Sequence, residues 1–217
     1  MFPVSDVIPS RTTPFVTIGL IAANALVFLY ELQLQPQEMF DFARAFGFVP
    51  ADPSASQLVT SVFVHDGWIH FGGNMLYLWI FGDNIEDALG HLAFLAFYLG
   101  AGALAALAHV ALHPSSSAPL IGASGAVAAV MGAYFVLYPR SQVLTAIFLV
   151  LYLDIVEVPA IVFLGVWLVM QLVSGLASMG AGAAGGVAFA AHVAGFIVGA
   201  LTGVVARKKR RAWEADC

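Results

Sequence analysis

Four polar side chains interrupt stretches of the sequence that are otherwise apolar, and their types are those of acyl-transfer chemistry. They are His70, Asn74, Ser124 and His192. An imidazole within hydrogen-bond reach of a serine hydroxyl can act as general base and make that hydroxyl a nucleophile. The oxyanion formed by the attack needs donors, and a second imidazole and an amide are suitable ones. These residues therefore predict a catalytic serine site that uses no metal and no other cofactor.

The local sequence around the first three residues suits this arrangement. His70 and Asn74 are four positions apart, so on a helix their side chains lie on one face. Ser124 is flanked by Gly122 and Gly125, which allow another backbone or a substrate to approach closely. Each neighbourhood is compatible with a crowded site at a helix surface.

Small residues follow His192 at a regular interval. Gly195, Gly199 and Gly203 repeat every fourth position, which places them along one face of a helix. A stripe of this kind lets a membrane helix press tightly against a neighbour. If that neighbour is the helix of Ser124, the imidazole reaches the serine hydroxyl.

The composition indicates which elements must position these residues. Of the 217 residues, 61% are hydrophobic and 10% are charged, whereas about a quarter of the residues of a soluble domain are charged. Lipid must therefore be the solvent for much of the chain, which excludes an ordinary soluble domain. The single cysteine, Cys217, excludes an internal disulfide and a cysteine metal cluster.

The apolar stretches predict an all-α polytopic membrane protein with six transmembrane helices. The expected helices cover residues 15–30, 68–85, 91–112, 120–138 and 159–178, and a sixth follows the Gly/Ala-rich loop 180–186 and ends near residue 206. One domain of residues 15–206 is expected, between a short irregular cytoplasmic lead-in (1–14) and a basic cytoplasmic tail (207–217). The mixed segment 31–65 is expected at the membrane interface, and the apolar run 143–153 is too short to cross.

The positions of the basic residues predict the orientation. With six crossings and a cytoplasmic N-terminus, seven of the eight basic residues lie on the cytoplasmic side and only Arg44 lies outside. The basic run 207–211 directly follows an apolar helix, which favours contact with anionic lipid over a nucleic acid partner. No signal-peptide cleavage site follows the first apolar stretch. We expect a multi-pass protein of the inner cell membrane with both termini in the cytoplasm.

This topology brings the candidate residues to one depth. The second, fourth and sixth helices all enter from the outer side, and the candidates lie within roughly 10 Å of their outer ends at 1.5 Å per residue. No intramembrane Asp or Glu lies at this depth to orient His192. The sequence therefore predicts a dyad of Ser124 and His192 rather than a triad.

Each candidate residue also has an interpretation that involves no catalysis. A serine in a membrane helix commonly bonds to its own helix, and His70 with Asn74 could simply join two helices. His192 could relay protons in a transporter, but the paired repeats typical of transporters are not evident. A metal-dependent protease would need an H-E-x-x-H motif, and an aspartyl protease is disfavoured because Asp83 and Asp154 fall near the cytoplasmic ends. The common depth favours the serine site.

Six short motifs between Pro14 and Gly203 are similar to those of one family. They are His65-Asp-Gly-Trp-Ile-His70-Phe-Gly-Gly-Asn74, Phe81-Gly-Asp-Asn-Ile-Glu86, Gly122-Ala-Ser124-Gly125, Tyr138-Pro139-Arg140, Trp167 with Gln171, and Ala191-His192-Val-Ala-Gly195. With these motifs the chain resembles the rhomboid intramembrane serine proteases in their bacterial six-helix form. The resemblance implies a Ser–His dyad, oxyanion donors at His70 and Asn74, and a water-filled cavity that opens to the outer face.

The resemblance also implies partners and roles for the loops. Substrates would be single-pass membrane proteins, cut near the outer end of their helix. His65 matches a family histidine near the cavity, to which we assign no role. The segment 31–64 corresponds to the membrane-dipping first loop of the family, and loop 180–186 to part of its lateral gate or cap. The alternative is a non-catalytic rhomboid-like chaperone or binding protein, which would be expected to lack the Ser or the His.

Two positions depart from the pattern of the family. Some members have a Trp-Arg pair in the first loop, where this chain has Ser56-Gln57. Some carry a Tyr that stacks on the catalytic His one turn after the nucleophile, where this chain has Ala128. We therefore expect Phe189 or Phe196 to support the ring of His192. Neither change removes a reacting group.

Overall fold

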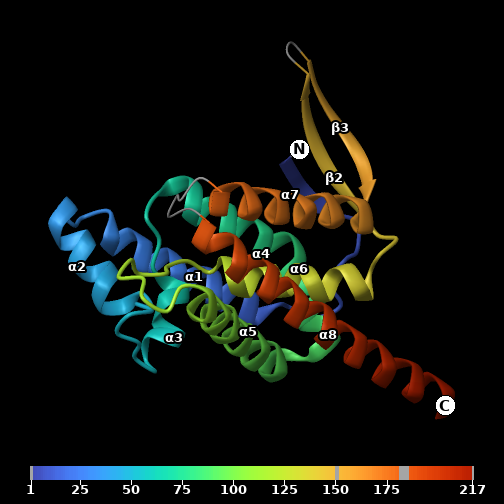
Figure 1. The fold of residues 1–217 in the computed structure, drawn as a ribbon. Coiled ribbons are helices and arrows are strands. Elements are labelled where there is room, and N and C mark those ends of the chain that lie inside the picture. Colours follow the sequence, from blue (N-terminus) through green and yellow to red (C-terminus); the bar gives the residue numbers. More distant parts are fainter. Residues whose placement is uncertain (1, 150–151, 181–185, 217) are drawn as a thin grey trace.

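In the computed structural model the described residues are 2–149, 152–180 and 186–216, and they are mostly helical. The elements are β1 (Phe2–Asp6), α1 (Phe15–Glu31), α2 (Pro36–Phe46), α3 (Gln57–Thr60), the 3₁₀ turn η1 (Ser61–Phe63), α4 (Trp68–Leu89), α5 (His91–Leu112), α6 (Ser124–Leu137), β2 (Gln142–Leu149), β3 (Tyr152–Pro159), α7 (Ala160–Gly180) and α8 (Gly186–Asp216). Figure 1 shows α2 and α3 at one side of the helical bundle, and the β2–β3 hairpin and the C-terminus at the other.

Helix α6 is the centre of the bundle. Every residue from Gly125 to Tyr134 is buried, and α4, α5, α7 and α8 all pack against this helix. A helix that is apolar on every side needs neighbours or lipid all round. Because protein surrounds α6, a polar residue at its end is held in place by several elements at once.

Helices α6 and α8 are in backbone contact. A Cβ added to Gly195 would overlap the carbonyl oxygen of Gly125, and a Cβ added to Gly199 would overlap that of Ala129. On the other helix, a Cβ added to Gly132 would overlap a carbonyl oxygen of α8. Since no side chain fits between them, the two backbones approach as closely as membrane helices with small residues can. The small-residue stripe of α8 thus faces the helix that carries the candidate nucleophile.

Glu86 of α4 fixes the beginning of α1. Its carboxylate is fully buried and accepts hydrogen bonds from the N–H groups of Val16 (2.9 Å) and Thr17 (2.7 Å). It also accepts from the Thr17 hydroxyl (2.7 Å) and lies 2.5 Å from Nδ1 of His91. The first N–H groups of a helix have no acceptor within the helix, and a carboxylate there also interacts favourably with the helix dipole. Glu86 therefore caps α1 from a neighbouring helix.

Three helices of the described residues are long and apolar enough to cross a membrane. They are His91–Leu112, Ala160–Ala177 and Phe189–Arg207. Helices α1 and α6 are apolar but shorter, and α4 carries three acidic side chains near its C-terminal end. The structure therefore establishes a mostly helical chain with three clear spans, and the count of six crossings stays a prediction.

The prediction of a purely helical chain is wrong for two segments. They form a three-stranded antiparallel sheet in the order β1-β2-β3. The expected irregular lead-in 1–14 contains β1, and the apolar run 143–153 lies in the β2–β3 hairpin, except for residues 150–151, which are outside the described residues. Strand β1 pairs with a segment far away in the sequence, so the local sequence of the lead-in does not reveal its partner.

Several other bounds differ from those expected from the sequence. Helix α5 has the expected bounds, α4 continues to Leu89, and α8 continues through the basic run to Asp216. The segment 31–65 contains α2, α3 and η1, and its position at the membrane interface stays a prediction. The expected gate or cap, loop 180–186, includes residues 181–185, which lie outside the described residues.

Helix α6 begins at Ser124 rather than at residue 120. Leu120 forms an isolated antiparallel bridge with Phe48 of the first loop. Gly122 has a φ of +106°, a backbone conformation that glycine adopts without strain and a helix does not use. Residues 120–122 are therefore not helical, Ala123 forms the turn that leads into the helix, and Ser124 is the first helical residue.

Replacing Gly199 by Ala is expected to destabilise the protein by about 1–3 kcal/mol, because the added Cβ would overlap the backbone of Ala129. The matched control is Gly100→Ala in α5, where an added Cβ meets nothing within 4 Å. This control should be neutral or slightly stabilising, since Ala has the higher helix propensity. Thermal unfolding of both variants in one detergent measures the difference. Equal Tm values would contradict the backbone contact.

Candidate active site

The side chains of Ser124 and His192 are in direct contact. The Ser124 hydroxyl donates a hydrogen bond to Nε2 of His192, 2.7 Å away on α8. The helix packing accounts for this contact, because Gly195, just after the histidine, lies against Gly125, just after the serine. A hydroxyl that donates to an imidazole has the geometry required for removal of its proton.

The other ring nitrogen of His192 is held by Gln171 of α7. Nδ1 lies 2.7 Å from Oε1 of Gln171, and an amide oxygen can only accept a hydrogen bond. The ring proton is therefore on Nδ1, and Nε2 is left to accept the proton of Ser124. Gln171 takes the place of the third member of a triad without adding a charge.

Aromatic side chains pack around the ring of His192. The ring centroid of Phe189 lies 6.3 Å away with the planes at 90°, and that of Trp167 lies 6.1 Å away. Phe196, which the sequence also suggested, stacks on Trp167 at 6.1 Å instead. The imidazole is thus supported on one side by α8 itself and on another by α7.

The two departures from the family pattern have structural explanations. Ala128 is fully buried and lies against a glycine of α8, so a larger side chain there would separate the two helices. Gln57 forms hydrogen bonds to three separate parts of the backbone of the first loop. Its Oε1 accepts from the N–H groups of Val49 (3.4 Å) and Ser54 (3.3 Å), and its Nε2 donates to the carbonyl oxygen of Arg44 (3.2 Å).

His70 lies beside the backbone that leads to the nucleophile. A Cβ added to Gly122 would overlap Nε2 of His70, so the imidazole touches the chain two residues before Ser124. Nδ1 of His70 lies 2.7 Å from a carboxylate oxygen of Asp66, which lies just before α4 begins. Nδ1 therefore donates to Asp66, and Nε2 is directed toward the segment that leads into α6.

Asn74 and the beginning of α6 provide further donors near this place. Asn74 is buried, and its Nδ2 donates to the carbonyl oxygen of His70 (2.9 Å). The amide has a second N–H, so it keeps donor capacity. Because α6 begins at Ser124, the first N–H groups of this helix have no acceptor within the helix and carry the positive end of its dipole. These groups are candidate donors for an oxyanion.

His65, to which the sequence assigned no role, supports the backbone just before Ser124. It is buried, its Nε2 accepts from the N–H of Ala123 (3.5 Å), and its Nδ1 lies 3.3 Å from the carbonyl oxygen of Phe63. A neutral ring with its proton on Nδ1 satisfies both contacts. Burial, together with the nearby His70 ring, lowers the pKa of His65 to about 4. His65 is therefore a positioning residue that stays neutral near pH 7.

The first loop holds the segment that leads into α6. Phe48 and Leu120 exchange two backbone hydrogen bonds (2.9 and 2.8 Å), and the N–H of Gly122 donates to η1 (2.9 Å). Glu31, the buried last residue of α1, accepts the backbone N–H of His65 (3.1 Å). The segment that leads into α6 is therefore held at Leu120, Gly122 and Ala123, which determines where α6 can begin.

The space beside Ser124 is small. A cavity of about 20 Å³ lies between the nucleophile, Gly125, Gly122 and α5, which is enough for about one water molecule. A peptide segment cannot enter without movement of these walls, and the open, water-filled cavity implied by the resemblance stays a prediction. Among the described residues, no group of three or more His, Cys, Asp or Glu side chains could hold a metal ion.

Three residues of this site entered the interpretation of the sequence only as parts of family motifs and had no individual role there: Asp66, Trp167 and Gln171. Asp66 precedes His70 by four positions, and Trp167 precedes Gln171 by four. This spacing places Trp167 and Gln171 on one face of α7, whereas Asp66 lies just before α4. This spacing is visible in the sequence. Only the packing of α7 on α8 shows that Gln171 faces His192.

Acid is expected to destabilise the protein through His65. Its pKa of about 4 in the fold lies below its ordinary value of 6.5, so the unfolded chain binds more protons between these two pH values. The free energy of unfolding therefore falls as the pH is lowered from about 6.5 to about 4. His65→Gln keeps an acceptor for Ala123 but does not titrate, so its Tm should fall less steeply over this range. Parallel Tm curves would show that another group is responsible.

The chain is similar to rhomboid proteins of three organisms. It is 35% identical over 134 residues to the Presenilin-associated rhomboid-like protein, mitochondrial, of Mus musculus, covering 60% of this chain and 35% of the relative. It is 32% identical over 157 residues to the Rhomboid protein 1, mitochondrial, of Saccharomyces cerevisiae, covering 69% and 41%. It is 30% identical to the RHOMBOID-like protein 12, mitochondrial, of Arabidopsis thaliana, covering 90% and 59%. The chain thus spans between 35% and 59% of the length of these relatives.

These relatives contradict the location expected from the sequence. The expectation was the inner membrane of a cell of the bacterial type, with both termini in the cytoplasm. The mouse, yeast and plant relatives are all named as mitochondrial proteins, so this expectation is wrong. The physical reason is that a count of basic residues orients a chain relative to one membrane, but it does not identify the membrane.

The family itself follows from the extent of the match. The sequence model of the Rhomboid domain matches residues 52–209, which is more than half of the 217 residues. The matched range includes the contact between Ser124 and His192, the Gln171 that holds the imidazole, and both His70 and Asn74. Family model, relatives and motifs agree, and the chain belongs to the rhomboid family.

Proposed function

We propose that this protein is a membrane serine endopeptidase that cleaves transmembrane segments with a dyad of Ser124 and His192. The observation that carries the proposal is the hydrogen bond from Ser124 to Nε2 of His192 (2.7 Å), with Nδ1 held by Gln171 (2.7 Å). A serine that only bonded to its own helix would not be directed at an imidazole. Membership of the rhomboid family adds support, because the family includes intramembrane serine proteases.

In the proposed reaction, Oγ of Ser124 attacks the carbonyl carbon of the scissile peptide bond while Nε2 of His192 takes the hydroxyl proton. In the imidazolium that forms, the proton on Nδ1 still donates its hydrogen bond to Oε1 of Gln171. His192 then gives its Nε2 proton to the leaving amine, and an acyl-enzyme remains. A water molecule next attacks the ester, again with His192 as base, and the proton returns to Ser124 as the carboxyl product leaves.

The oxyanion of each tetrahedral intermediate would be stabilised by the first N–H groups of α6 and by the second N–H of Asn74. His70 adds a donor at Nε2 only when its ring carries both protons, because the Nδ1 proton is already donated to Asp66. The doubly protonated ring would form an ion pair with this carboxylate, 2.7 Å away. We therefore assign Asp66 the role of orienting the His70 ring through the hydrogen bond at Nδ1.

The membrane arrangement and the substrate are also proposals. Helices α1, α4, α5, α6, α7 and α8 would provide six crossings within a domain of residues 15–206, followed by a basic tail (207–217) that continues α8. Three of these helices are clearly long and apolar enough. Substrates would be single-pass membrane proteins cut at the depth of Ser124. The mitochondrial names of the relatives favour a mitochondrial membrane for this chain.

A non-catalytic rhomboid-like chaperone or binding protein is the second candidate function. The small cavity beside Ser124, about 20 Å³, favours it, since a substrate segment does not fit into this space as it stands. The oriented imidazole favours the protease, because a binding protein has no need of a base on the serine. Chemical labelling of the serine separates these two candidates.

A fluorescent fluorophosphonate, which reacts with activated serines, is expected to label the purified wild type in mild detergent. Ser124→Ala should abolish labelling, and His192→Ala should slow it by on the order of 10³-fold or more. Ser117→Ala, in the exposed loop before α6, is the matched control and should label normally. A folded wild type that neither labels nor cleaves a single-pass test substrate in liposomes would support the non-catalytic alternative.

Gln171→Leu is expected to lower the labelling rate by about 10²-fold, because the His192 ring loses the partner that sets its orientation and its protonated nitrogen. The neighbouring Met170→Leu is the control, since Met170 is 60% exposed and lies outside the site. Labelling rates and Tm are measured together, and the Tm values of the two variants should be close. If Gln171→Leu labels as fast as Met170→Leu, Gln171 does not position the base.

A further inference from the structure

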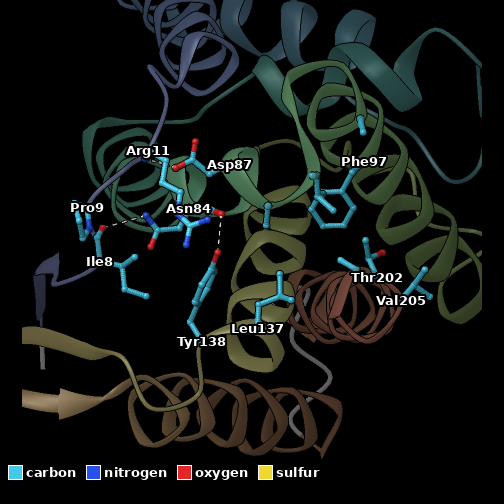
Figure 2. Close-up of a pocket in the computed structure, with 14 residues that line it drawn as sticks. Ile8, Pro9, Arg11, Asn84, Asp87, Phe97, Leu137, Tyr138, Thr202 and Val205 are labelled. Atoms are coloured by element: carbon cyan, nitrogen blue, oxygen red, sulfur yellow. Dashed lines mark hydrogen bonds between the residues drawn. The ribbon is translucent and has the colours of Figure 1, made fainter. Parts of the chain in front are cut away.

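A cavity of about 520 Å³ lies at the end of the bundle away from the dyad. Figure 2 shows its walls, which come from the segment before α1, from α4, and from the facing ends of α5, α6 and α8. Leu137, the last residue of α6, lines it, and Ser124 is the first residue of the same helix. At 1.5 Å per residue, the cavity is roughly 20 Å from the nucleophile. It is therefore a separate feature of the molecule.

One part of this cavity is apolar and, in the proposed membrane arrangement on which this inference rests, lies within the hydrocarbon region. Phe97 of α5 and Val205 of α8 line it together with Leu137. Phe97 and Val205 both belong to segments that are long and apolar enough to cross a membrane. Hydrocarbon chains suit the space between these apolar side chains, because a water molecule would find no hydrogen-bond partners there.

Three arginine side chains line the other part of this cavity and the cavity that adjoins it. Arg11 lines the cavity in Figure 2. An adjoining cavity of about 470 Å³ is lined by Arg140 and Arg207 and shares Leu137 and Tyr138 with the first. Arg207 ends the apolar window of α8. In the proposed membrane arrangement, the three guanidinium groups would lie where the hydrocarbon region gives way to lipid headgroups.

The local charge around the two cavities is positive. The acidic side chain that lines them is Asp87, and its carboxylate accepts the backbone N–H groups of Arg11 (2.5 Å) and Thr12 (3.1 Å) and the Thr12 hydroxyl. Within the described part of the chain, the ion pairs involve histidines of α4 and α5 and no arginine. Arg140 and Arg207 form no ion pair in the described part of the chain, whereas Arg11 is attracted by the Asp87 carboxylate. Three guanidinium groups against one carboxylate still leave a positive site that suits a phosphate group.

We propose that the two cavities together bind one anionic phospholipid. Its phosphate lies between Arg11, Arg140 and Arg207, and its acyl chains lie against Phe97 and Val205. A ligand that binds only the folded state stabilises it. Because the lipid contacts α6 and α8 at their ends remote from the dyad, it stabilises the helix pair that holds Ser124 and His192 together.

The test uses the full-length protein purified in a neutral detergent. Dioleoylphosphatidylglycerol, dioleoylphosphatidylcholine and inorganic phosphate are titrated separately, with Tm and the lipid retained in native mass spectrometry as readouts. We expect phosphatidylglycerol to be retained with one molecule per chain and to raise Tm, and at least tenfold weaker effects from the other two. The triple variant Arg11→Gln, Arg140→Gln, Arg207→Gln should lose the response, and Arg44→Gln, in α2, should keep it.

Several results would overturn the proposal. Equal retention of phosphatidylcholine would show an unspecific apolar groove, and an equal Tm shift with inorganic phosphate would show a site for free anions only. A full response in the triple variant would show that the lipid binds elsewhere. If the triple variant does not fold, the single variant Arg140→Gln is tested instead, because Arg140 is exposed. An affinity for phosphatidylglycerol that falls at least threefold supports the proposal. An unchanged affinity rejects it.

Discussion

The backbone contact between α6 and α8 is the constraint on which the rest of the structure depends. Glycines on both helices bring them so close that a Cβ at Gly132, Gly195 or Gly199 would overlap the opposite backbone. In lipid, where helices gain little from hydrophobic association, such close packing is a main source of stability. The same contact brings Ser124 and His192 to 2.7 Å. Stability of the bundle and assembly of the dyad therefore have one physical cause.

Neutral hydrogen-bonding groups surround this contact and orient the polar side chains. Gln171 holds the ring of His192, His65 accepts from Ala123, and Gln57 joins the backbone of the first loop. In a medium of low dielectric, an unpaired polar group is costly, and an ion needs still more compensation. An amide or a neutral imidazole satisfies its partner without the desolvation cost of a carboxylate. This explains how a membrane site can orient its base without an acidic residue.

The two ends of the bundle differ in the side chains that line them. At one end, the first loop and α4 surround the nucleophile with donors. At the other end, Glu86 caps α1, and the arginine-lined cavities adjoin the ends of α6 and α8. Because both ends share these two helices, the proposed lipid at one end would act on the same packed pair that carries Ser124 and His192 at the other. The helix pair α6–α8 would thus link lipid binding to the proposed chemistry.

The apolar spans, the bounds of α5 and the pairing of Ser124 with His192 were predictable from the sequence, because apolar runs and short motifs are local properties. The sheet was not predictable, since β1 pairs with a segment distant in the sequence. The contacts of Gln171 and His65 were likewise undetermined. They depend on which faces of α7 and of the first loop turn toward α8 and α6, and only the packing of helices distant in sequence decides which hydrogen-bond partners meet.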